Sequence, residues 1–198
     1  MRILIIGGQG TIGQAIAAQF DCEHDLILIG RSPQPSVDIA DPASIERLYQ
    51  AIGSCDAIVC AAGGAAFHEV SDLTPDNNET AIRSKLLGQV NLVLIGQHYL
   101  ATGGSFTLTT GVMTDEPIRH CTSAAMANGG VEAFVRSAAL GLANGQRLNA
   151  VSPGLLNESR DKYGAYFPGF ETVSAARVAR AYVKSLTGPQ NGQIVKVR

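Results

Sequence analysis

Short apolar runs alternate with longer, helix-like segments along the whole chain. Most of the runs are continuously apolar rather than mixed with polar residues, as in the stretch from Arg2 to Ile6. Parallel strands that are covered by helices on both faces have this pattern. Regular alternation of strands and helices is typical of a doubly wound α/β sheet. The pattern therefore predicts one parallel sheet of about seven strands with helices on both faces, and a single domain over residues 1–198.

The same pattern sets the bounds of the expected elements. Strands are expected at residues 2–6, 26–29, 36–39, 57–61, 105–110, 148–151 and 193–197. Helices are expected from residue 13 to about residue 20 and over residues 42–52, 77–100, 122–142 and 175–186. The helix over residues 42–52 has Pro42 at its first position and apolar residues at Ile45, Leu48 and Ile52, one helical turn apart.

Composition and charge exclude several classes of protein. Hydrophobic residues make up 45% of the chain and charged residues 16%, so the chain can form a packed core and is not disordered. The net charge of -2 offers no strongly basic face for nucleic acid. No apolar stretch is long enough to span a membrane, and the N-terminus lacks a signal-peptide pattern. Scattered cysteines at 22, 55, 60 and 121 indicate reduced thiols, which is typical of a cytoplasmic protein.

A glycine-rich turn follows the first predicted strand. It runs from Gly7 to Gly13 as Gly-Gly-Gln-Gly-Thr-Ile-Gly and leads into a predicted helix. Glycines in this context allow a tight turn and close approach of the backbone to a pyrophosphate, beside the N-terminus of the helix. A plain tight turn is the alternative. The context favours a Rossmann-type dinucleotide site to which Gly7, Gln9, Gly10, Thr11, Ile12 and Gly13 contribute.

The end of the second predicted strand bears on the choice of cofactor. An NAD site is expected to have an acidic residue there for the ribose hydroxyls. This strand ends in Ile29-Gly30-Arg31-Ser32, with no acid. Arg31 can make a bidentate contact with a 2′-phosphate, and Ser32 can donate a hydrogen bond to it. We therefore predict NADP(H) rather than NAD(H); the alternative is that Arg31 is only a solvated surface residue.

At this point the sequence resembles the short-chain dehydrogenase/reductase family over essentially the whole chain. The resemblance is carried by Asp38-Ile39, Cys60-Ala61-Ala62-Gly63, Gly103-Gly104-Ser105-Phe106, Gly130-Val131-Glu132-Ala133-Phe134 and Asn149-Ala150-Val151-Ser152-Pro153-Gly154. It implies further cofactor contacts at Asp38, Ile39, Ala61, Ala62, Gly63, Pro153 and Gly154. It also implies a homodimer or homotetramer built on the helices from Asn77 to Leu100 and from Thr122 to Leu142.

The residues that the family uses for catalysis are replaced. Alignment through the matching motifs puts Ala124 at the position of the family's tyrosine acid and Asn128 at that of its lysine. Gly111 stands at the serine position, one residue after Thr110, and Lys85 stands at the relay asparagine. Because an alanine cannot transfer a proton, the usual mechanism cannot run through position 124.

In this alignment lysine and asparagine are exchanged between two helices rather than lost. If these helices pack as in the family, Lys85 and Asn128 face one pocket, where Lys85 would polarise a substrate or bind ribose and Thr110 would hydrogen-bond a carbonyl. The alternatives are that Lys85 extends to solvent and that Thr110 is an ordinary strand residue. His120 and Tyr163 are weaker candidates for the missing proton donor. The four histidines share no metal-ligand spacing, so no metal site is expected.

Two functions from different classes remain open at this stage. The first is an NADP(H)-dependent oxidoreductase that acts on a small carbonyl or alcohol with a non-standard proton donor. The second is a catalytically inactive NADP(H)-binding scaffold or redox sensor, which the replaced catalytic residues favour. A third and weaker possibility is an atypical reductase of a sugar-like or flavin-like substrate. Neither a nucleic-acid partner nor a membrane partner is expected.

Overall fold

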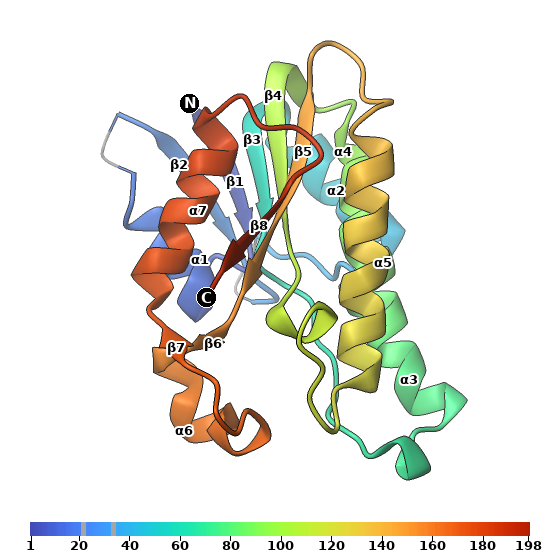
Figure 1. Cartoon of the computed structure of the whole chain (residues 1–198). Coiled ribbons are helices and arrows are strands. Elements are labelled where there is room, and N and C mark those ends of the chain that lie inside the picture. Colours follow the sequence, from blue (N-terminus) through green and yellow to red (C-terminus); the bar gives the residue numbers. More distant parts are fainter. Residues whose placement is uncertain (21–22, 33–34) are drawn as a thin grey trace.

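The computed structural model describes residues 1–20, 23–32 and 35–198, and its centre is a six-stranded parallel sheet (Figure 1). The strand order is β2-β1-β3-β4-β5-β8, and every neighbouring pair is parallel. The strands are β1 (Arg2–Ile6), β2 (Asp25–Ile29), β3 (Cys55–Cys60), β4 (Leu100–Thr109), β5 (Arg147–Pro153) and β8 (Ile194–Val197). The predicted doubly wound α/β fold is confirmed, with six strands in the main sheet instead of about seven.

Helices cover both faces of the sheet (Figure 1). One face packs against α1 (Thr11–Ala17) and α7 (Ala175–Thr187), and its core includes Ile16, Val178 and Tyr182. The other face packs against α2 (Pro42–Ile52), α4 (Gly88–Gly96) and α5 (Thr122–Ala138), and its core includes Tyr49, Leu92 and Val131. Burial on both faces explains why the strands are continuously apolar.

The predicted third strand at residues 36–39 is wrong. Only an isolated parallel bridge between Gly30 and Ser36 forms there. The side chain of Asp38 accepts a hydrogen bond from the backbone N–H of Ala40 at 3.0 Å, which bends the chain away from an extended ladder. Val37 and Ile39 are nevertheless buried, so the apolar positions that suggested a strand belong to a loop packed on the core.

The predicted helix from Asn77 to Leu100 is divided in the structure. It comprises α3 (Pro75–Ala81), a π-helical segment (Ile82–Leu87) and α4, which ends at Gly96. Thr74 caps the first turn through a hydrogen bond from the backbone N–H of Asn77. Leu100 opens strand β4 and pairs with Cys55. The residues predicted as the last turn of the helix therefore connect α4 to the sheet.

Two helices end earlier than predicted, and one pair of short strands was not predicted. The helix after the glycine turn ends at Ala17 rather than near residue 20, and α5 ends at Ala138 rather than at Leu142. After α5 the chain makes tight turns, and the side chain of Leu140 is exposed. A small parallel pair formed by β6 (Leu155–Leu156) and β7 (Thr172–Val173) was not predicted; it brackets α6 (Arg160–Tyr163). Cys22 lies outside the described residues, and Cys55, Cys60 and Cys121 are buried free thiols.

The topology fixes where a ligand can bind. The chain passes from β1 to β2 on one side and then returns to place β3 on the other side of β1. In open α/β sheets such a reversal of strand order leaves a crevice at the carboxyl ends of the strands. In Figure 1 these ends point to the edge at which α3, α6 and the connecting loops lie.

No helix among the described residues is long and apolar enough to cross a membrane.

Candidate functional site

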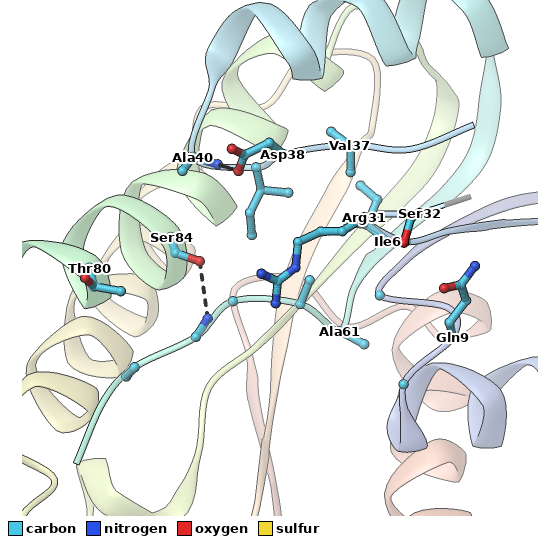
Figure 2. Close-up of a pocket in the computed structure, with 18 of the residues that line it drawn as sticks. Ile6, Gln9, Arg31, Ser32, Val37, Asp38, Ala40, Ala61, Thr80 and Ser84 are labelled. Atoms are coloured by element: carbon cyan, nitrogen blue, oxygen red, sulfur yellow. Dashed lines mark hydrogen bonds between the residues drawn. The ribbon is translucent and has the colours of Figure 1, made fainter. Parts of the chain in front are cut away.

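A cavity of about 870 Å³ opens at the carboxyl ends of β1, β2 and β3 (Figure 2). Its walls come from the glycine turn, from the end of β2 and the loop after it, and from the chain that follows β3. Residues lining it are Ile6, Gly7, Gln9, Gly10, Gly30, Arg31, Ser32, Val37, Asp38, Ile39, Ala40, Ala61, Ala62, Gly63, Gly64, Ala65, Ala66, Thr80 and Ser84.

The glycine turn is held close to the neighbouring strands. The backbone N–H groups of Gly7 and Gly8 both donate to the carbonyl of Ile29 at the end of β2. Gly7 has a φ of +83°, and a Cβ there would lie 2.7 Å from the backbone of Ala61. A Cβ on Gly13 would overlap the carbonyl oxygen of Gly7. These positions therefore require glycine, and the floor of the cavity is bare backbone that a phosphate group can approach.

Arg31 projects into the same cavity. Figure 2 shows its guanidinium group between the loop that carries Asp38 and the chain at Ala61, with Ser32 at the rim. Gln9 stands across the cavity, and a Cβ on Gly30 would lie 2.7 Å from its side-chain oxygen. The cavity thus joins bare backbone with a cation, a combination that suits a phosphorylated ligand.

Ten of the predicted cofactor residues line this cavity and five do not. The ten are Gly7, Gln9, Gly10, Arg31, Ser32, Asp38, Ile39, Ala61, Ala62 and Gly63. Thr11, Ile12 and Gly13 belong to the first turn of α1. Pro153 ends β5, and Gly154 lines a second cavity of about 310 Å³ with Val112, Glu116 and Arg198.

Sequence reasoning missed two hydroxyl groups in the wall of the main cavity. Thr80 and Ser84 lie four residues apart, at the end of α3 and in the π-helical segment. The Ser84 hydroxyl accepts a hydrogen bond from the backbone N–H of Gly64 at 3.2 Å (Figure 2). Their helical spacing was a usable signal, because residues at i and i+4 share one face.

Lys85 is buried, with 9% of its surface exposed, so the expectation that it extends to solvent is wrong. Its Nζ donates to the carbonyl oxygen of Thr109 at 3.4 Å, at the end of β4. Burial lowers the pKa of the Lys85 ammonium group, and the nearby Cys60 acts in the opposite direction. The backbone of Lys85 packs under Gly63, where a Cβ would lie 3.1 Å from the lysine Cα.

Asn128 lies in α5 with 0% of its surface exposed. Neither the oxygen nor the nitrogen of its side-chain amide has a hydrogen-bond partner among the described residues. Its Nδ2 faces Gly111, since a Cβ at that glycine would lie 3.3 Å away. Leaving a buried amide unpaired costs about 1–3 kcal/mol for each unmet group. Such an amide fits a ligand that offers both a hydrogen-bond donor and an acceptor.

Thr110 and Ala124 complete the region at the end of β4. The Thr110 hydroxyl donates to the buried carboxylate of Glu132 at 3.2 Å, and Glu132 also pairs with Arg136. The Thr110 hydroxyl can therefore accept a hydrogen bond from a ligand. It can donate one only if its hydrogen bond to Glu132 is broken. Ala124 is buried and offers no proton.

The two weaker candidates, His120 and Tyr163, lie in one aromatic cluster. Phe67 stacks on both Tyr163 and Tyr166, with ring centroids 5.5 and 4.8 Å apart, and His120 meets Tyr166 edge-on. His120 Nε2 also lies 3.4 Å from a carboxylate oxygen of Glu69. The cluster joins loops that follow β3, β4 and β5, which the sequence did not reveal because the contacts are far apart along the chain.

The fold is a parallel sheet whose strand order reverses at β1, and the glycine turn lies beside the crevice at that reversal. These features define a dinucleotide-binding protein of the Rossmann class. Comparison with known proteins narrows this class. The family model described as Enoyl-(Acyl carrier protein) reductase matches residues 27–194. The protein lin1944 from Listeria innocua is 48% identical, with a TM-score of 0.98 and full coverage of both chains. The chain therefore belongs to the short-chain dehydrogenase/reductase family, whose members are oxidoreductases that bind nicotinamide cofactors.

Two further relatives are informative. A small-chain dehydrogenase solved in complex with NADPH is 27% identical, with a TM-score of 0.88, over 100% of this chain and 96% of that chain. Versicolorin reductase stcU of Emericella nidulans is 30% identical over 155 residues, which are 71% of this chain and 56% of that protein. The chain thus spans little more than half the length of this curated relative.

Proposed function

We propose that the protein is an NADP(H)-dependent oxidoreductase of a small carbonyl or alcohol substrate. The observation that carries the proposal is the buried Lys85, whose ammonium group is held at the carboxyl end of β4. A chain that only bound a dinucleotide would have no need for a buried cation there. The relative solved with NADPH supports the choice of cofactor.

The residues present fit this cofactor. The backbone of the glycine turn accommodates the pyrophosphate, Arg31 and Ser32 bind the 2′-phosphate, and Asp38 and Ile39 lie on the adenosine side of the cavity. The Asn128 amide would pair with the hydroxyls of the nicotinamide ribose, which offer donors and acceptors together. When bound, the cofactor supplies the hydride. Pro153 and Gly154 are expected to contact the cofactor on its nicotinamide side.

Lys85 replaces the missing tyrosine in this proposal. Reduction of a carbonyl puts negative charge on the substrate oxygen, and a preorganised cation stabilises that charge. The Lys85 ammonium group is the cation at the end of β4, and its lowered pKa makes proton donation easier. Thr110 donates its hydroxyl hydrogen to Glu132, so it is an acceptor for the hydroxyl group of the alcohol form of the substrate.

A second function is favoured by one specific observation. The motif alignment assigns Ala124, which is buried and apolar, to the position of the family's proton donor. This replacement favours an NADP(H)-binding scaffold or redox sensor without catalysis.

A screen of turnover separates the two functions. The purified protein is incubated with NADPH and a panel of aldehydes, ketones and quinones, and loss of NADPH absorbance is followed. Oxidation of NADPH that depends on one of the carbonyl compounds supports the oxidoreductase. Tight NADPH binding without turnover of any compound in a broad panel supports the scaffold.

We also propose that the protein forms a homodimer or homotetramer through the region from Asn77 to Leu100 and α5. Exposed apolar side chains lie along these elements, including Leu94 with 49% and Met126 with 45% of their surface exposed. We expect light scattering at micromolar protein concentration to give a dimer or tetramer mass. A Met126→Lys variant should shift the mass toward the monomer, and a monomer mass for the unaltered protein would refute the assembly.

A further inference from the structure

The side-chain amide of Gln89 contacts the backbone carbonyl of Lys85. In the π-helical segment the hydrogen bonds are displaced by one residue, and the N–H of Gly88 donates to the carbonyl of Arg83, five residues back. At the next residue, the side chain of Gln89 turns back and its Nε2 donates to the carbonyl of Lys85, four residues earlier, at 2.9 Å. Gln89 has 0% of its surface exposed, so this bond is shielded from water. Segments of π-helix are frequent at functional sites.

The same amide also pairs with the last residue of β4. The N–H of Thr110 donates to Val151 in β5, and the backbone groups of Thr109 therefore face the side of β3. The paired residues of β3 and β4 end at Val59 and Thr107, so β3 offers Thr109 no strand partner. Gln89 Oε1 accepts from the N–H of Thr109 at 2.8 Å, and Nε2 donates to its carbonyl at 2.9 Å. The side-chain amide thus takes the place of a strand backbone.

The carbonyl oxygen of Thr109 therefore has two donors, Gln89 Nε2 at 2.9 Å and Lys85 Nζ at 3.4 Å. We infer that Gln89 is a positioning residue for Lys85, because it fixes the backbone carbonyl of the lysine and the Thr109 carbonyl that accepts from the lysine ammonium group. The inference rests on the proposed function only in taking Lys85 as the cation of the site. Gln89 does not line the main cavity and makes no hydrogen bond to the Asn128 side chain, so its effect on the site is expected to pass through Lys85.

Two substitutions separate positioning from simple packing. Gln89→Met keeps the length of the side chain but removes all three hydrogen bonds, so Lys85 loses its fixed position. Gln89→Glu is nearly isosteric and places a carboxylate beside the shared carbonyl, which stabilises the protonated lysine. The titratable group that faces Lys85 from β3 is Cys60, whose pKa burial raises to about 11, so this thiol is neutral near pH 7.

A matched control lies at the opposite end of β4. Gln146 is also buried, and its Nε2 donates to the carbonyls of Gln97 and Leu100 at 2.9 and 2.7 Å. Gln146→Met therefore removes a comparable buried amide that bonds the first residue of β4, at the end of the strand away from Thr109. Both methionine variants should lower the Tm, because both leave buried carbonyls unpaired.

The experiment follows the Lys85 side chain directly by NMR. The chain has four lysines, at positions 85, 162, 184 and 196. Lysine labelled with carbon-13 at the ε-carbon therefore gives few signals, and the Lys85 signal is the one missing from Lys85→Met. Its chemical shift is followed against pH in the unaltered protein and in the three glutamine variants, without cofactor or substrate.

We expect Gln89→Met to displace the Lys85 signal and its titration midpoint, Gln89→Glu to move the midpoint to higher pH, and Gln146→Met to change neither. If both Gln89 variants leave the Lys85 titration as in Gln146→Met, Gln89 only packs the core and the inference is overturned. If Gln89→Met does not fold, Gln89→Glu decides alone. NADPH affinity is measured on the same samples, so that failure of the unaltered protein to bind NADPH overturns the proposed function without affecting the NMR result.

Discussion

Replacing Lys85 with methionine is expected to lower turnover by about 10²–10³-fold while the dissociation constant for NADPH stays nearly unchanged. The side chain reaches the carbonyl of Thr109 from a buried position, so its charge is held at the end of β4 before any substrate arrives. Methionine has a similar length and no charge, and it leaves the packing under Gly63 in place. The change therefore removes stabilisation of the developing charge without disturbing the cavity of the glycine turn.

The measurement is single-turnover hydride transfer on a carbonyl found in the turnover screen, with NADPH binding followed by fluorescence. Lys184→Met is the control, because Lys184 is an exposed lysine on α7. Full activity in Lys85→Met would make Lys85 a structural residue and would contradict the mechanism.

The pH profile provides an independent check on Lys85. The protonated lysine is the active form in reduction, and this form is lost as the pH rises through the pKa of Lys85. Because burial lowers that pKa, we expect the rate of reduction to fall at a lower pH than an ordinary lysine would give. The residual activity of Lys85→Met should not show this fall in rate with rising pH.

The second large effect is expected from Arg31→Asp, which should reverse the preference for NADPH over NADH. Arg31 lies in the cavity wall with its guanidinium group pointing inward (Figure 2). One bidentate charged contact is worth about 1.5–3 kcal/mol, or about 10- to 150-fold in affinity. An aspartate would repel the 2′-phosphate of NADPH and could accept hydrogen bonds from the ribose hydroxyls of NADH.

Fluorescence titrations with both cofactors measure this change. Arg177→Asp makes the same change of charge on an exposed residue of α7, away from the cavity, and should leave the preference unaltered. An Arg31→Asp variant that still prefers NADPH would show that another group recognises the 2′-phosphate.

Most of the sheet and its helices could be predicted because local patterns specify them. Helix α2 has its predicted bounds, since Pro42 and the apolar face of Ile45 and Leu48 mark it clearly. The strand expected at residues 36–39 failed because burial of Val37 and Ile39 in a loop gives the same pattern as a short strand. The π-helical segment was missed because its residues continue an apolar helical pattern and only the tertiary contacts of Gly63 and Gln89 reveal it.

The site shows the same division between local and tertiary signals. The glycine turn and Arg31 were found because their spacing after strands carries the signal. The motif alignment placed Lys85 and Asn128 in one region, and both side chains lie at the end of β4, while their roles stay predictions. The aromatic cluster of Phe67, Tyr163 and Tyr166 and the bridge made by Gln89 depend on chain folding.

The central claim is that the crevice binds NADPH, and a fluorescence titration of the unaltered protein tests it most directly. NADPH and NADH are titrated separately into the purified protein at fixed pH and salt. We predict saturable binding of both, with NADPH bound more tightly by about 10-fold or more. Equal affinities would contradict the role of Arg31, and no saturable binding of either nucleotide would contradict the whole account.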